Sequence, residues 1–158
     1  MRRAHDLERA VGMAWYASDV AGTGGHLRER PADFRVTERE RFEAQPLDGD
    51  PGDYPWLVLR VTLTATDTND FARALSNAAG ISRERVAWAG TKDKHAITTQ
   101  LFTVRDLDPE VVPDVEGAEI ELVGRAGRGL AFGDLLGNEF EVVVRDPARP
   151  AQADTVAE

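Results

Sequence analysis

The sequence of 158 residues predicts an α+β fold, with a mixed or antiparallel sheet and helices packed on one side of it. Residues 56–64, WLVLRVTLT, are rich in β-formers and mostly apolar, which is typical of a strand. A helical pattern follows, capped at Asp67 or Thr68 and running to about Ala79, with Gly80 at its end. Further extended segments come next, and the order β, α, β with hairpins after it indicates an α+β sheet domain.

The part of the chain before this strand carries weaker signals. Residues 3–16 show a loose helical pattern and are expected to form an N-terminal helix. Residues 21–25, AGTGG, lack the spacing of a phosphate-binding loop and are expected to be a flexible connector. Alternation from Phe34 onward predicts a short half-buried strand, and the turn formers of residues 45–53 predict a loop.

Residues 86–105, VAWAGTKDKHAITTQLFTVR, predict a strand, a tight turn at Gly90 and Thr91, and a second strand. Another extended pair is expected at Ala118–Val123 and Asn138–Arg145.

Composition excludes several classes of site. The chain has no cysteine, so it has neither disulfides nor thiolate metal ligands, and its three histidines are scattered without metal-binding spacing. No apolar run is long enough for a signal peptide or a bilayer span, which predicts a cytoplasmic protein.

The net charge of -9 would ordinarily argue against a polyanionic partner. The chain has 28 acidic residues against 17 arginines and 2 lysines, however, and this composition resembles that of proteins adapted to concentrated salt. An acidic surface of that kind says little about partners, so only local basic clusters are informative.

Both lysines, Lys92 and Lys94, flank Asp93. Two nearby ammonium groups favour the ionised form of a carboxylate, which could then act as a nucleophile or stabilise a developing cation. Taken alone, the motif is more often a solvated, charge-compensated loop.

Three segments give the motif a context. AGTKDKHAITTQ (residues 89–100) resembles the signature of the TruD family of tRNA pseudouridine synthases, a Gly-x-Lys-Asp turn followed by Ala-x-Thr-x-Gln. LRERPADFRVTE (27–38) resembles the family's N-terminal motif, and LLGNEFEVVVR (135–145) resembles its Gly-Asn-x-Phe strand. Together these segments extend the resemblance over most of residues 24–145.

The resemblance implies that uridine in tRNA, typically at position 13, is converted to pseudouridine without cofactor or metal. It assigns the catalytic carboxylate to Asp93, which either attacks the nucleotide or assists glycosidic cleavage. The implied substrate-binding residues are Arg28, Phe34, Lys92, Asn138 and Phe140. Among them, Phe140 matches the aromatic that stacks on the target base. Without the family context, both phenylalanines would be read as buried strand residues.

This chain departs from the family pattern at two positions. Arg28 stands where lysine is usual, and it keeps the charge that would pair with Asp93. Ala32 stands where glutamate is usual, a change expected to be tolerated. Arg125 and Arg128 are further candidates for phosphate contacts, with a solvated loop as the alternative.

Family members are longer than this chain and carry an inserted domain. We therefore expect residues 1–145 to form the N-terminal half of the catalytic domain and residues 146–158 to be a linker toward the insertion. An incomplete sheet would leave an open edge and allow self-association. Two alternatives to an active enzyme are an inactive RNA-binding fragment of one and a salt-adapted interaction domain that does not bind RNA.

Overall fold

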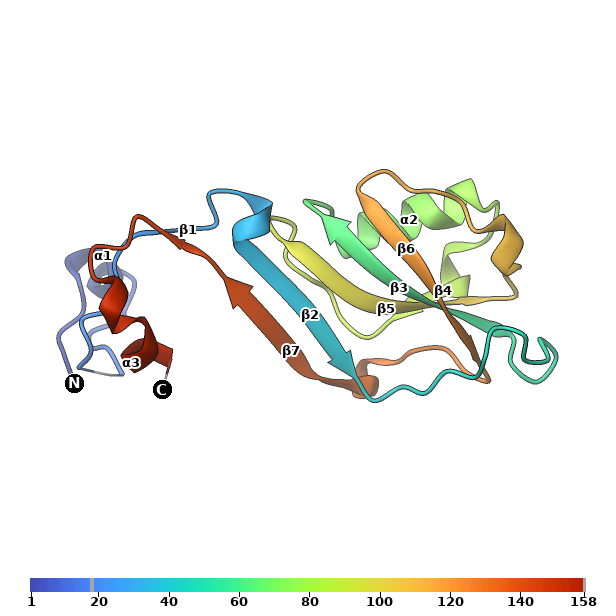
Figure 1. The fold of residues 1–158 in the computed structure, drawn as a ribbon, viewed down its shortest axis with the longest axis horizontal. Coiled ribbons are helices and arrows are strands. Elements are labelled where there is room, and N and C mark those ends of the chain that lie inside the picture. The colour runs from blue at the N-terminus through green and yellow to red at the C-terminus, as the bar shows by residue number, and fades with distance from the viewer. Residues whose placement is uncertain (18, 158) are drawn as a thin grey trace. The chain divides into compact units, whose positions relative to one another are not determined.

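The computed structural model describes residues 1–17 and 19–157. It has two compact units, of which one comprises Leu27–Val143 and the other combines Met1–His26 with Val144–Glu158. The first unit confirms the α+β prediction, because a mixed six-stranded sheet carries helix α2 on one face (Figure 1). The predicted division into a catalytic half and a linker stays a prediction.

The elements of the larger unit are β2 (Phe34–Glu40), β3 (Trp56–Thr64), α2 (Thr68–Ala78), β4 (Val86–Trp88), β5 (Ile97–Arg105), β6 (Ala118–Ala126) and β7 (Leu135–Val142). Its 3-10 turns are Pro31–Asp33, Arg83–Arg85, Pro109–Val111 and Phe132–Asp134. The smaller unit contains α1 (Asp6–Ala10), the 3-10 turn Pro150–Gln152 and α3 (Ala153–Ala157). In the sequence, the division between the units falls within the short strand β1 (His26–Leu27) and directly before the short strand β8 (Val144–Arg145).

The sheet runs in the order β6-β3-β5-β2-β7, with β4 paired to part of β5. Strands β2 and β5 are parallel, whereas the other pairs are antiparallel. Strands β6 and β7 form the two edges. Self-association through an edge stays a prediction.

The main core lies between α2 and one face of strands β3 and β5. Leu59 of β3 lies opposite Phe102 of β5, and the ring of Phe71 from α2 meets Phe102 edge-on at 4.8 Å between centroids. All three side chains are fully buried. Asp67 caps the helix by accepting from the backbone N–H groups of its first turn.

Three expectations differ from the structure. The N-terminal helix is shorter than predicted, because only Asp6–Ala10 is helical and Gly12 adopts φ +97°. Its apolar positions are exposed, Leu7 by 75% and Val11 by 80%, so no burial extends the helix.

The predicted tight turn at Gly90 is wrong. Val86 pairs with Val104 and Trp88 pairs with Phe102, so β4 lies against the far half of β5. Residues 89–96 therefore form an extended connecting loop, which we call the Asp93 loop.

The expected pairing of the two later segments is also wrong. Strand β6 pairs with β3 and β7 pairs with β2, at opposite edges of the sheet (Figure 1). Among the described residues, no helix is long and apolar enough to cross a bilayer.

Candidate active site

A cleft of about 380 Å³ lies on the α2 side of the sheet, beside β2, β7 and the Asp93 loop. Its lining residues are Phe34, Val36, Thr91, Lys92, Asp93, Asn138 and Phe140. The structure thus brings together five of the six residues that the family resemblance selected. The sixth, Arg28, contacts two of the five.

Strand register explains how residues far apart in the sequence meet here. Val36 lies opposite Phe140 and Glu38 lies opposite Asn138 in the antiparallel pair of β2 and β7. Because side chains alternate along a strand, Phe34 shares this face. The rings of Phe34 and Phe140 lie 5.8 Å apart at 42°, and Phe140 is 58% exposed, so its ring is available to a ligand.

Arg28 links Asp93 to an aromatic ring. Its guanidinium Nη2 lies 3.0 Å from Asp93 Oδ2, while its Cζ lies 3.8 Å from the centroid of Phe34. The cation therefore lies over the ring and is paired with the carboxylate at the same time. Arg28 has φ +58°, an unusual conformation for a residue other than glycine.

The Asp93 loop is anchored to the core from two sides. The Lys92 N–H donates to Thr68 Oγ1 at 3.1 Å, at the first residue of α2. Gln100 of β5, whose side chain is buried, donates from Nε2 to the carbonyl of Gly90 at 3.2 Å. Neither anchoring contact was predicted from the sequence, because each joins separate elements of the fold.

The ammonium of Lys92 pairs with Glu38 and not with Asp93, its neighbour in the sequence. Its ammonium is paired with the buried carboxylate of Glu38, and it also donates to Asn138 Oδ1 at 2.7 Å. The Lys92 side chain is 8% exposed and that of Glu38 is 0% exposed. The cation paired with Asp93 is therefore Arg28 rather than Lys92.

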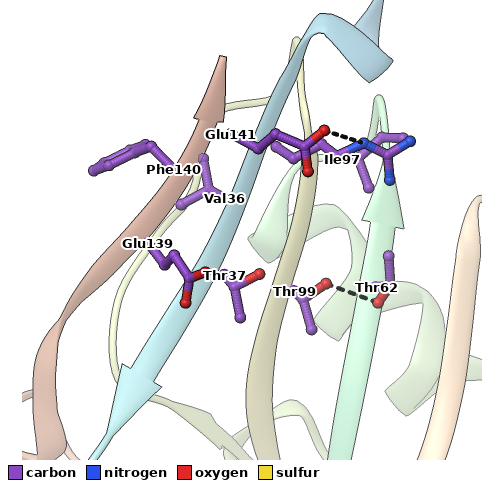
Figure 2. A pocket seen from close by; sticks show the side chains of 9 residues that line it. Val36, Thr37, Thr62, Ile97, Thr99, Glu139, Phe140 and Glu141 are labelled. Atoms are coloured by element: carbon purple, nitrogen blue, oxygen red, sulfur yellow. Dashed lines mark hydrogen bonds and ion pairs between the residues drawn. The ribbon is translucent and has the colours of Figure 1, made fainter. Parts of the chain in front are cut away.

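The opposite face of the sheet is polar and carries a separate hollow of about 310 Å³. Figure 2 shows Thr37, Thr62 and Thr99 there, with Phe140 pointing away from them. The hydroxyls of Thr62 and Thr99 share a hydrogen bond of 2.9 Å. None of the predicted site residues except Phe140 borders this hollow.

The two candidate phosphate ligands make internal contacts. Arg125 is 8% exposed and donates from Nε to the carbonyl of Leu47 at 3.1 Å. Arg128 makes two hydrogen bonds of 2.7 Å to Asp134 and lies over the ring of Phe42. The hydrogen bond from Arg128 holds the pKa of Asp134 below its usual range. These contacts favour a structural role for both arginines.

Within the described part of the chain, no group of three or more His, Asp or Glu side chains could hold a metal ion. The chemistry that this cleft offers is that of a carboxylate beside an exposed aromatic ring and an amide, with an arginine paired to the carboxylate.

Comparisons with known proteins agree with the geometry. Residues 10–158 match the family model of tRNA pseudouridine synthase D (TruD). The proteins named "Probable tRNA pseudouridine synthase D" from Halobacterium salinarum and Natronomonas pharaonis are 67% and 62% identical over 100% and 99% of this chain. A crystal structure of the Methanosarcina mazei protein assigned as tRNA pseudouridine synthase D (TruD) superposes with a TM-score of 0.81 and 31% identity over 99% of this chain. The chain spans about a third of the length of these relatives, 36% of the first two and 35% of the third.

Proposed function

The chain belongs to the tRNA pseudouridine synthase D (TruD) family, and on that premise we propose that it isomerises uridine to pseudouridine in tRNA. The observation that carries the proposal is the single cleft in which Asp93, Asn138 and Phe140 meet, although they come from a loop and a distant edge strand. We expect the target to be position 13, as the family resemblance implies. A tRNA substrate also fits a cytoplasmic location.

The proposed reaction needs no second reactant. The bond between ribose C1′ and uracil N1 breaks, the base turns, and a new bond joins C1′ to C5. C5 loses a proton and N1 gains one, so the product is an isomer of the substrate. The protein must hold the detached base and stabilise charge while the bond is open.

Asp93 is the proposed catalytic carboxylate. Its side chain is 54% exposed at the cleft, and Arg28 pairs with it and orients it. An ionised carboxylate can either attack the nucleotide as a nucleophile or stabilise the cationic sugar as the glycosidic bond opens. Both routes require the same residue, and a substitution of Asp93 stops both.

We assign different roles to the two aromatic side chains, Phe140 and Phe34. An enzyme that reacts at a base must take that base out of the RNA stack and hold it against a π-face. Phe140 offers an exposed ring for this purpose. The ring of Phe34 carries the guanidinium of Arg28, so we assign Phe34 to the positioning of that arginine.

The test is pseudouridine formation on an unmodified tRNA transcript, read at single-nucleotide resolution in high-salt buffer. We expect wild type to modify one uridine and Asp93→Asn to lose at least about 1,000-fold in rate. Because the Asp93 ion pair is half exposed, the variant should unfold at nearly the same temperature as wild type. A rate in the variant close to that of wild type, or loss of its fold, would contradict the assigned role.

A second candidate function is RNA binding without turnover, for which the exposed ring of Phe140 could serve as a stacking surface for a base. It predicts salt-sensitive tRNA binding with no product from folded wild type. A domain that does not contact RNA would show no binding at any salt concentration.

A further inference from the structure

Glu38 is a buried carboxylate beside the cleft. It lies on β2, opposite Asn138 of β7, and is 3% exposed. An ionised carboxylate at such depth is unfavourable unless a cation and further hydrogen bonds compensate it.

Lys92 supplies the cation and extends the contact to Asn138. Its ammonium pairs with Glu38 and donates to Asn138 Oδ1 at 2.7 Å. An ammonium has donors and no acceptor, so it must face the oxygen of the amide and cannot face its nitrogen. The Nδ2 group of Asn138 is thereby left for the cleft, where no described residue accepts a hydrogen bond from it.

We propose that Glu38 is a positioning residue: it holds the Lys92 ammonium against Asn138 Oδ1 and so presents Asn138 Nδ2 to a carbonyl oxygen of the target pyrimidine. This inference rests on the proposed function and deepens it. Uracil has carbonyl oxygens at C2 and C4, whereas cytosine has an amino group at C4. A fixed donor aimed at C4 would favour uracil, because cytosine would place a donor against a donor.

Glu38 could instead serve only the stability of the sheet, and two variants test whether a loss of stability accounts for a loss of activity. Glu38→Gln leaves the Lys92 ammonium buried without a counter-charge, so both roles predict lower stability. Adding Lys92→Met removes the unpaired charge, and stability should recover. Activity that recovered together with stability would rule out the positioning of Asn138 through Glu38 and Lys92. The positioning role predicts no recovery, because Asn138 then lacks its donor. Since Lys92 itself lines the cleft, the comparison with Asn138→Ala decides whether the loss acts through that amide.

The assay is the single-turnover rate on the tRNA transcript, beside the thermal unfolding midpoint of each variant. We expect Glu38→Gln to lower the rate about 10- to 100-fold, as for a misplaced contact group. Combining Glu38→Gln with Asn138→Ala should lower the rate no further than Asn138→Ala alone, since both act through one amide. The control is Glu139→Gln, a neighbouring exposed carboxylate that pairs with Arg39 on the other face and should leave the rate unchanged.

A nitrogen-proton NMR spectrum tests the positioning without turnover. The side-chain NH₂ signals of Asn138, identified by their loss in Asn138→Ala, should shift in Glu38→Gln and in the Glu38→Gln, Lys92→Met double variant, but not in Glu139→Gln. Three results would each overturn the role of Glu38. The first is that the Asn138 signals do not shift in Glu38→Gln, and the second is that the rate losses of Glu38→Gln and Asn138→Ala multiply when the two are combined. The third is that activity recovers in the Glu38→Gln, Lys92→Met double variant. If wild type gave no product while the Asn138 signals still shifted in Glu38→Gln, the proposed function would be overturned and the positioning of Asn138 would stand.

Discussion

Replacing Arg28 by lysine separates the two contacts that its guanidinium makes. Lysine keeps a positive charge near Asp93 but lacks the planar group that lies 3.8 Å from the Phe34 ring centroid. Such stacking contributes about 0.5–1 kcal/mol at an exposed site. If that energy holds the charge in place during the reaction, Arg28→Lys should lower kcat/KM by about 2- to 5-fold.

Arg28→Ala removes the ion pair as well. With side chains 42% and 54% exposed, the pair of Arg28 and Asp93 contributes about 0.2–1 kcal/mol. The combined loss of about 0.7–2 kcal/mol corresponds to a 3- to 30-fold decrease in kcat/KM. Arginine, lysine and alanine all meet the same strain at φ +58°, so the series compares side chains alone.

The measurement is kcat/KM for pseudouridine formation on the tRNA transcript at one fixed salt concentration. Arg35→Lys is the matched control, since Arg35 is half exposed on the other face of β2 and makes a loose pair with Glu141 at 4.0 Å. Full activity in Arg28→Lys would refute the contribution of the stack on Phe34. A loss as large as that of Asp93→Asn would show that Arg28 takes part in the chemistry itself, and it would refute this reasoning too.

Three further predictions concern stability and binding. Asp67→Ala should lower the free energy of unfolding by about 1 kcal/mol at pH 7. Because the hydrogen bond from the Asn69 N–H lowers the pKa of Asp67 in the fold, urea titrations should show this difference fading as the pH falls below about 4. Arg128→Ala should lower the free energy of unfolding by about 1 kcal/mol, because it removes the pair with Asp134. The affinity for tRNA and its dependence on salt concentration should stay unchanged. A weaker salt dependence in the variant would reveal a phosphate contact. Phe140→Ala should leave the unfolding midpoint nearly unchanged, because the ring is 58% exposed. It should lower kcat/KM by about 5- to 150-fold if a base stacks on this ring. A fully active variant would contradict the stacking of a base on Phe140.

The sequence predicted best the elements whose signals are local. Strand β3 and helix α2 match their predicted bounds closely, since alternation, an N-cap at Asp67 and a terminal Gly80 all lie within a few residues of the element that they define. The partners of β6 and β7 could not be predicted in this way. Both strands carry ordinary β-patterns, and pairing at opposite edges depends on contacts far away in sequence.

The candidate site was likewise predicted only in part from the sequence. Family motifs identified the residues of the cleft, and the structure places them around one volume. The partner of Lys92 was missed, because proximity in sequence favoured Asp93. A signal was nevertheless present: Glu38 shares a strand face with Val36, and an acidic residue on a buried face needs a cation.

The burial of Lys92 has a practical consequence for chemical labelling. The chain contains two lysines, and the amine of one is enclosed with Glu38 while Lys94 is exposed. An amine-reactive dye at neutral pH should therefore attach to Lys94 and to the amino terminus, and leave Lys92 unmodified. A fluorophore on Lys94 would sit next to Asp93, where its emission could report the arrival of RNA at the cleft in real time.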